Sequence, residues 1–274
     1  MSLREPGEEN DPYRPHRLTK PSVNYSSGQV SYDKQVAESI LDDTFHCQIA
    51  YFDPEEEVVR IVPRQYGRSR DGDFLYVHGP GDYPDQHAEP PVEHSSRLYR
   101  LVRSGKVRKV TVSVAIVDAL VPAQAAPEAV LSYRSVVIFG RACAVLEGGA
   151  GGEKCSALHT ITNHIMPGYA DHSRKADKEE LGHVGVIRID FEHVSSKVRN
   201  GGPPASDDSS THWAGVVPVR QVYGPPITAP DLRGRVPVPE YVKNLTGSRG
   251  AHELVVDPRK HSDEPRRLPG APRI

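Results

Sequence analysis

A short cluster of basic residues is the part of the sequence best suited to bind a charged ligand. Between positions 97 and 109 the chain carries six basic side chains and no acidic one: Arg97, Arg100, Arg103, Lys106, Arg108 and Lys109. Arginine forks match phosphate oxygens in bidentate pairs, and a short cluster suits a small anion better than a polymer. The residues therefore favour a site for a mono- or diphosphate ligand; the alternative is a solvated helix face and strand start.

Other patterns that suggest chemistry each lack an essential residue. A phosphate-binding loop needs glycine at the position that Glu153 occupies in Gly148–Lys154, so we expect a flexible connector there. His159 and His164 stand about 140° apart around a helix, without a carboxylate partner, so no metal site is expected. Ser135 lies inside a predicted strand, not on the tight turn that carries a hydrolase nucleophile.

The composition argues against several classes of protein. The 274 residues include 34 Lys and Arg against 36 Asp and Glu, and this net charge of -2 disfavours a nucleic-acid or membrane-surface binder. The longest apolar stretch, near 110–117, is far shorter than the ~20 residues of a membrane-spanning helix. Cys47, Cys143 and Cys155 form no C-x-x-C pair, which indicates a reducing compartment. We expect a cytoplasmic protein that binds neither nucleic acid nor membrane.

Short strands separated by polar turns dominate the hydrophobic pattern. Ser31 is the predicted N-cap of a short helix, and further helices are expected at 95–104, with Gly105 as a left-handed cap, and at 153–165. Strands are expected at 45–51, 58–62, 74–78, 107–121, 133–146, 184–198 and 213–219. Because strands and helices do not alternate, the pattern predicts a mainly β protein with peripheral helices, built as an antiparallel barrel or sandwich.

The two ends of the chain differ from its middle. The first thirty residues show no hydrophobic periodicity, and the last fifty hold many prolines. Such segments bury too little apolar surface to offset the entropy lost on ordering. We expect a flexible N-terminal segment at 1–30, one folded domain at 31–245 and a disordered C-terminal tail at 246–274.

Five blocks of sequence point to a known family. They are LYVHG (75–79), VTVSV (110–114), YRSVVIFG (133–140), SKVRNG (196–201) and WAGVVP (213–218). In this order they resemble the pyridoxamine 5'-phosphate oxidase-like split-barrel proteins, specifically the flavin-nucleotide-binding branch that includes nitroimidazole-resistance proteins. The resemblance implies a six-stranded antiparallel split β-barrel of the FMN-binding type, a homodimer that holds one FMN in each of two clefts at the subunit interface.

The same resemblance implies a set of cofactor-binding residues. One strand would run beside the isoalloxazine, a second would border the cofactor, two arginines would hold its phosphate, and a third strand would lie near the cleft. The residues in these roles are, in turn, Val62, Pro63, Arg64 and Gln65; Tyr76, Val77 and His78; Arg97 and Arg100; and Tyr133, Arg134 and Ser135, with Trp213 at the interface or over the ligand.

Several of these residues also have ordinary structural interpretations. Tyr133 and Arg134 must project to opposite sides of a strand, and a buried tyrosine beside an arginine paired on the rim is the alternative to a cofactor site. His78 would donate either to the flavin or to a backbone carbonyl. Lys197 and Arg199 project to one side of a strand and offer a second anion site or an intersubunit ion pair.

The expected function is that of an FMN-dependent oxidoreductase acting on a small amine- or nitro-bearing molecule. The flavin would supply the redox chemistry, and Tyr133 or His78 would be the catalytic proton donor where one is needed. The alternative is a non-catalytic flavin- or haem-binding or storage protein of the same fold. A true pyridoxamine 5'-phosphate oxidase is disfavoured, because the C-terminal strand region shows no paired basic motif for a substrate phosphate.

Overall fold

The structure is a computed structural model that describes residues 11–20, 29–81, 84–85, 92–93, 96–146, 152–204, 211–230, 232 and 236–245. The predicted tail at 246–274 lies outside the described residues, as does most of the predicted N-terminal segment 1–30. Residues 148–151 of the predicted connector also fall outside them.

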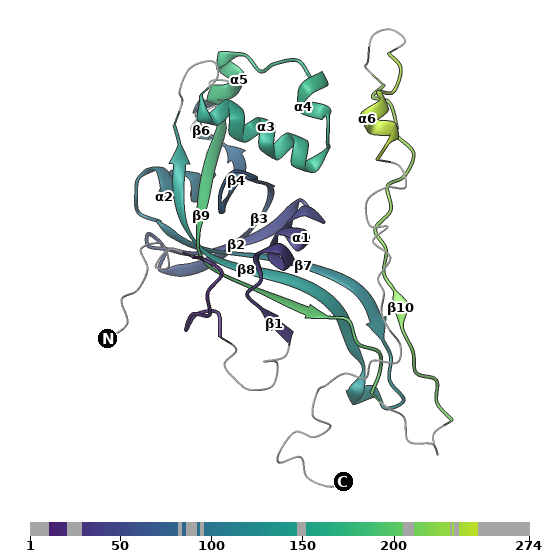
Figure 1. Ribbon diagram of the computed structural model, residues 1–274. Helices are drawn as coiled ribbons and strands as arrows, with labels where there is room; N and C mark the ends of the chain where they lie inside the picture. Colours follow the sequence, from purple (N-terminus) through teal and green to yellow (C-terminus); the bar gives the residue numbers. More distant parts are fainter. Residues whose placement is uncertain are drawn as a thin grey trace.

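Six antiparallel strands close into a ring (Figure 1). The order around the ring is β9 (Val184–Arg199), β4 (Phe74–Pro80), β3 (Val58–Arg68), β2 (His46–Asp53), β7 (Lys109–Val121) and β8 (Val130–Val145), and β8 pairs with β9 to complete it. Shorter strands are β1 (Val30–Ser31) on β9, β10 (Val217–Pro218) on β7, and the pair β5 (Pro84–Asp85) and β6 (Val92–Glu93). The predicted six-stranded antiparallel split barrel is confirmed.

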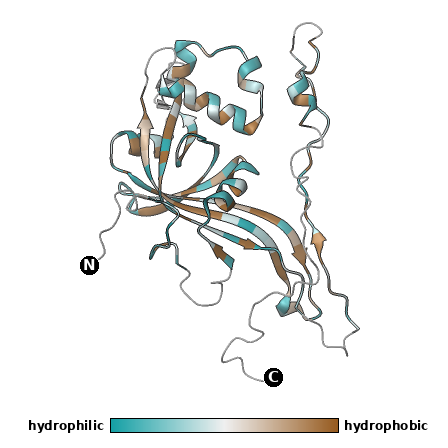
Figure 2. Ribbon diagram, in the orientation of Figure 1, coloured by the Kyte–Doolittle hydropathy of each residue, from teal (hydrophilic) through white to brown (hydrophobic). Residues whose placement is uncertain are grey.

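Alternating apolar residues place the core inside the ring. On β7, Val110, Val112 and Val114 are buried, and Val136 and Ile138 of β8 pack with them. Successive strand residues point to opposite faces, so this period of two fills the interior and leaves the other face outward. Figure 2 shows the resulting hydrophobic stretches along the long strands.

The helices lie outside the ring. They are α1 (Lys34–Asp42), α2 (Arg97–Arg103), α3 (Glu153–Ile165), α4 (Tyr169–His172), α5 (Lys178–Gly182) and α6 (Glu240–Lys243), with a 3-10 turn at Ala126–Glu128. Gly105 follows α2 with φ +73°, as predicted for a left-handed cap. The predicted cap of α1 was wrong: Asp33, not Ser31, accepts a hydrogen bond from the Gln35 N–H at 2.7 Å.

An irregularity in the β7–β8 ladder sits beyond the ring. The register shifts between Val117 and Ala119, so Asp118 has no partner opposite it on β8. An extra residue of this kind bends its strand and increases the local twist. In Figure 1 the outer halves of β7, β8 and β9 curve away from the ring toward β10.

Helix α3 packs directly on the backbone of β3. A Cβ atom built on Gly67 would lie 2.6 Å from the Cα and N atoms of Ile161. Real Cβ contacts are never that close, so only glycine allows α3 to seat there and bury Ala157 and Ile161 with Tyr76.

We predict that Gly67→Ala lowers the free energy of unfolding by about 2 kcal/mol, the usual cost of forcing extra volume into a packed core. The control is Gly224→Ala, because nothing lies within 4 Å of a Cβ at Gly224. Urea unfolding followed by circular dichroism measures both. Equal stability of the two variants would contradict the close packing of α3 on β3.

Candidate functional site

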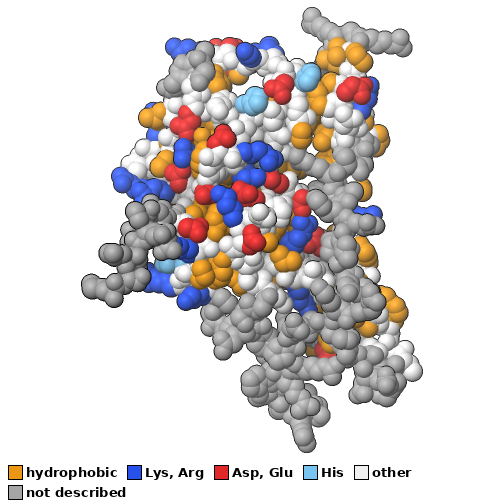
Figure 3. Space-filling model, in the orientation of Figure 1, with side chains coloured by type: hydrophobic (Ala, Val, Ile, Leu, Met, Phe, Trp, Pro, Cys, Tyr) orange, Lys and Arg blue, Asp and Glu red, His pale blue; other side chains and the backbone are white. Residues whose placement is uncertain are grey.

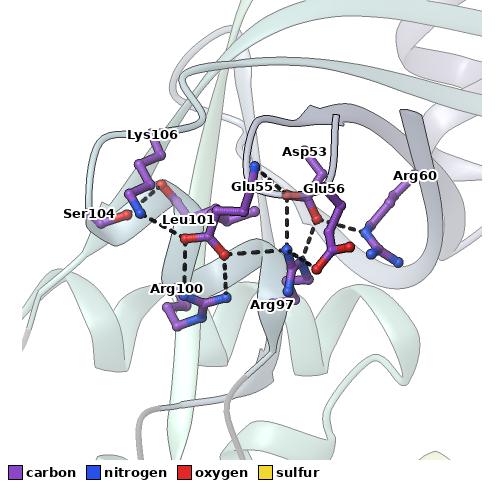
Figure 4. Close-up of polar contacts among 9 residues, drawn as sticks. All are labelled: Asp53, Glu55, Glu56, Arg60, Arg97, Arg100, Leu101, Ser104 and Lys106. Atoms are coloured by element: carbon purple, nitrogen blue, oxygen red, sulfur yellow. Dashed lines mark hydrogen bonds and ion pairs between the residues drawn. The ribbon is translucent and has the colours of Figure 1, made fainter. Parts of the chain in front are cut away.

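The predicted phosphate-binding arginines lie against a hairpin turn rich in carboxylates (Figure 4). Asp53 ends β2, and its side chain is fully buried. Arg97, the first residue of α2, donates to both carboxylate oxygens of Asp53, at 3.1 Å from its Nη2, and the Arg60 Nε donates to the same carboxylate at 2.7 Å. These bonds hold the pKa of Asp53 well below its ordinary value.

The neighbouring carboxylate engages the rest of the basic cluster. Glu55 accepts from the Arg100 Nη2 at 2.8 Å and from the Lys106 Nζ at 2.7 Å, and these two bonds lower its pKa to about 2. Lys109 is paired with Glu192 at 2.5 Å. The assignment of Arg97 and Arg100 to a phosphate therefore stays a prediction, and a ligand at either would compete with carboxylates of the same chain.

A second part of the molecule contains an arginine whose hydrogen-bond partners among the described residues are uncharged. Arg64 on β3 donates from Nη2 to the Ser96 hydroxyl at 2.7 Å and from Nη1 to the Pro63 carbonyl at 2.9 Å. Gly79 on β4 borders it, since a Cβ there would lie 3.5 Å from the Arg64 Nε. Within the described residues Arg64 forms no ion pair with a carboxylate.

His78 lies close to this arginine. Its side chain is half-buried, and burial, aided by the positive charge of Arg64, lowers its pKa below the ordinary 6.5. The ring is therefore neutral at pH 7 and carries one donor and one acceptor nitrogen. Arg64, His78 and Ser96 come from β3, β4 and the residue before α2, and the structure brings them together.

The other two predicted residues of β4 are enclosed. Val77 lies in the core of the ring, whereas Tyr76 points the opposite way, under α3. The Tyr76 hydroxyl donates to the Glu153 carboxylate at 3.0 Å, and burial, together with that carboxylate, raises the pKa of Tyr76 to about 12. Contact with a cofactor would have to come through their backbone.

Tyr133 and Ser135 share the outward face of β8. They pair across the ladder with Val117 and Ala115 of β7, and Ser135 also faces Lys197 of β9. All three predicted residues of β8 are half-buried. On β3, Pro63 and Gln65 are exposed, while Val62 and Arg64 alternate with them and are half-buried.

Arg134 projects from the other side of β8 into a carboxylate pair. Its Nε and Nη2 donate to the two oxygens of Asp118 at 2.9 and 3.0 Å, and its Nη1 donates to Asp43 at the end of α1. Asp118 is buried, and the hydrogen bonds that Arg134 donates to its carboxylate are the main cause of a raised pKa at Arg134. The sequence predicted the alternation of Tyr133 and Arg134 but gave no sign of these acidic partners.

Trp213 lies on a separate segment near β10. The residue is 67% exposed, and its indole packs over the backbone of Gly215, where a Cβ would come within 2.6 Å of the ring. The Gly215 N–H donates to the Pro122 carbonyl at 3.1 Å. A side chain at position 215 would collide with the tryptophan ring, which explains the glycine of the WAGVVP block.

A groove that sequence reasoning missed lies where residues 11–20 cross β9. The rings of His16 and His193 stack at 3.6 Å between centroids, and the Val194 N–H donates to the Pro12 carbonyl at 2.7 Å. The groove has a volume of about 690 Å³ and mixed charge; its lining is Asp11, Arg14, Pro15, His16, Lys109, Arg141, Asp190, Phe191, Glu192 and His193. Among the described residues there is no group of three or more side chains placed to hold a metal ion.

Docking of residues 11–20 should weaken in acid. Burial is the main cause of a lowered pKa at His193; the charges of His16 and Lys109 lower it further, and Glu192 opposes them. The docked state therefore binds a proton at His193 less readily than the undocked state, and protonation below the ordinary pKa of 6.5 disfavours docking. Hydrogen exchange of the Val194 amide, corrected for intrinsic rates, should show protection at pH 7.5 that falls by pH 5.5. His16→Phe keeps a stacked ring without charge and should reduce this dependence; equal protection at both pH values would contradict it.

Loss of Arg134 should destabilise the fold far more than loss of an exposed arginine on the same strand. Arg134→Ala leaves buried Asp118 without its partner, which typically costs about 3 kcal/mol. Arg141→Ala is the control, because Arg141 is 61% exposed and meets Glu192 only at 3.4 Å, a pair that contributes about 1 kcal/mol or less. Urea unfolding distinguishes the two, and similar losses would show that the carboxylate pair does not anchor β8.

Comparisons with known proteins agree with this architecture. Residues 90–198 match the family model described as pyridoxamine 5'-phosphate oxidase. No curated protein matches the chain. Within the described residues, no helix has both the length and the hydrophobicity needed to cross a membrane.

Two solved structures are similar over most of their length. The FAD and heme binding protein from Mycobacterium smegmatis is 26% identical with a TM-score of 0.67, over 80% of this chain and 98% of that one. A flavocytochrome from Azotobacter vinelandii is 24% identical with a TM-score of 0.69, over 84% of this chain and 97% of that one. The chain thus has the fold of the pyridoxamine 5'-phosphate oxidase-like split-barrel proteins, as its five sequence blocks predict.

Proposed function

We propose that this protein binds a flavin nucleotide and is an FMN-dependent oxidoreductase acting on a small amine- or nitro-bearing molecule. The observation that carries the flavin is the likeness to the FAD and heme binding protein, which extends over 98% of that chain at 26% identity. The two flavins share an isoalloxazine and a ribityl phosphate. A site for that common part serves either one.

Arg64 is the residue best prepared to hold the flavin phosphate. Within the described residues, the half-buried Arg64 guanidinium donates to a hydroxyl and a carbonyl and to no carboxylate, so it keeps donors for a charged acceptor. Arg97 and Arg100 already donate to Asp53 and Glu55, so a phosphate there would first have to displace carboxylates. Of the arginines predicted to bind the cofactor, Arg64 would therefore lose the least interaction with its own chain on binding a phosphate.

His78 beside Arg64 and Tyr133 on the separate strand β8 would take the remaining tasks of such a site. A bound flavin would supply the hydride chemistry. Neutral His78 would accept or donate a hydrogen bond at the cofactor edge without adding charge. Tyr133, on the outward face of β8, would place a hydroxyl as the proton donor to substrate.

The outward face of the sheet supports the homodimer that this function requires. Phe52, Val59 and Ile61 on β2 and β3, and Val117 on β7, are each at least 42% exposed. A monomer rarely leaves so many large apolar side chains on one sheet uncovered. A flavin held between two such faces would be shielded from water on both sides.

A non-catalytic flavin- or haem-binding protein is the second candidate. The Mycobacterium smegmatis protein, by its name, binds both groups, and nothing in the fold separates storage from catalysis. The domain at 31–245 would be the functional unit. Free thiols at Cys47, Cys143 and Cys155 support a cytoplasmic location.

Titration of the purified protein with FMN and with FAD, followed by flavin fluorescence, tests the proposal. Arg64→Ala should raise the dissociation constant about 10- to 100-fold, because a hydrogen bond to a charged group typically contributes 1.5–3 kcal/mol. Arg100→Ala is the matched control and should leave affinity nearly unchanged.

The reverse order of effects would place the phosphate at the basic cluster, and failure to bind either flavin would overturn the proposal. A Soret band after haem addition, without flavin uptake, would favour the second candidate. Amines that reduce the oxidised flavin, or nitro compounds that reoxidise the reduced flavin, separate an enzyme, which turns over, from a carrier, which does not.

A further inference from the structure

A bulge in the β8–β9 ladder shapes one wall of the groove between residues 11–16 and the sheet. The register shifts just before Gly140 on β8, and Glu192 is the extra residue on β9. Phe191 and Val194 both pack with the core, so the two residues between them, Glu192 and His193, lie side by side on the outer face. A Cβ on Gly140 would lie 2.7 Å from a carbonyl oxygen of β9, so glycine leaves room for this bulge.

The first described residues supply the opposite wall. The Pro12 carbonyl accepts a hydrogen bond from the edge of β9, and the His16 ring stacks on that of His193 with 4° between the ring planes. The His16 Nδ1 accepts from the Leu18 N–H at 3.2 Å, so the neutral ring carries its proton on Nε2 and can donate it. Both histidines and Phe191 are half-buried and line the groove, which therefore offers flat aromatic surfaces.

The charges of the groove do not balance within it. Three cations and three carboxylates line it, but Asp190 is paired with Arg188, outside the lining, at 2.7 Å. Three cations then face two carboxylates. Glu192 alone serves both Lys109, at 2.5 Å, and Arg141, at 3.4 Å, and these two side chains are 71% and 61% exposed. In Figure 3, Lys, Arg and His side chains gather at the lower left, near the first described residues.

We propose that the groove binds a small molecule that combines one flat ring with a carboxylate or phosphate group. The ring stacks on the histidine pair and Phe191, and the anionic group accepts hydrogen bonds from Arg141 and Lys109. The volume of about 690 Å³ is that of an ordinary ligand site. None of the lining residues belongs to the flavin site proposed above, so this is a second ligand and the inference goes beyond the proposed function.

Isothermal titration calorimetry at pH 7.5 with benzoate and with phenyl phosphate tests the site. At least one should bind saturably, and the tighter of the two identifies the anionic group. Benzamide, a ring without charge, and inorganic phosphate, a charge without a ring, should each bind at least tenfold more weakly. Arg141→Ala should weaken the tighter probe at least tenfold. The matched control is Arg174→Ala, because Arg174 is 72% exposed and is also paired with a glutamate, Glu180; its affinity should not change.

Each other outcome overturns the inference. Benzamide binding as tightly as benzoate removes the anionic group, inorganic phosphate binding as tightly as phenyl phosphate removes the ring, and saturable binding of neither probe removes the site. Displacement of the probe by FMN, with weaker FMN binding in Arg141→Ala, would make the groove the flavin site and leave no second ligand. Failure of the wild type to bind flavin overturns the proposed function alone, because the probes are titrated without flavin.

Hydrogen exchange of the wild type decides the matter should Arg141→Ala misfold. A ligand that contacts residues 11–16 and β9 together stabilises their docking. At ten times its dissociation constant, the probe should slow exchange of the Val194 amide about tenfold. The Tyr66 amide, which donates to the Phe45 carbonyl outside the groove, is the control and should exchange at its original rate. An unchanged rate at Val194 would contradict the site.

Discussion

The ion pairs of Arg134 tie together parts of the molecule that come from three places in the sequence. Asp43 closes α1, Asp118 is the extra residue of the β7 irregularity, and Arg134 on β8 reaches both. Two carboxylates, Asp42 and Asp43, stand at the C-terminus of α1, where the helix dipole disfavours negative charge. Arg68 pairs with the first at 2.8 Å and Arg134 with the second, so these arginines offset that repulsion and fix the helix against the sheet.

Regular periodicity made much of the fold predictable. The alternating valines of β7 and the residues 153–165 of α3 specify their structures locally, and the closure of six strands follows the resemblance. The irregularity at Asp118 and the short helices α4 and α5 were missed, because register and single helical turns depend on tertiary contacts. The predicted strand at 213–219 reduces to Val217–Pro218, since a proline cannot extend a ladder by donating.

The candidate site was less predictable because its electrostatics depend on distant residues. The sequence between 97 and 109 shows a basic cluster. Its acidic partners Asp53 and Glu55 lie more than forty positions earlier, and the turn between β2 and β3 brings them to α2 in the folded chain. Conversely, the resemblance placed Arg64 beside the isoalloxazine and gave it no part in holding the phosphate. Its partners in the described residues are a hydroxyl and a carbonyl and not a carboxylate, and spacing in the sequence carries no record of that.

Closure of the ring also decides how the protein can meet other chains. Each of the six strands has a neighbour on both sides, and in the described part of the chain the outer edges of β9 and β7 are occupied by β1 and β10, two residues each. Long, flat, unpaired edges recruit strands from other molecules and lead to aggregation. Here β10 ends in Pro218, which has no N–H to offer. Growth by strand addition is thereby blocked, and association is directed to side-chain faces, where it can be specific and finite.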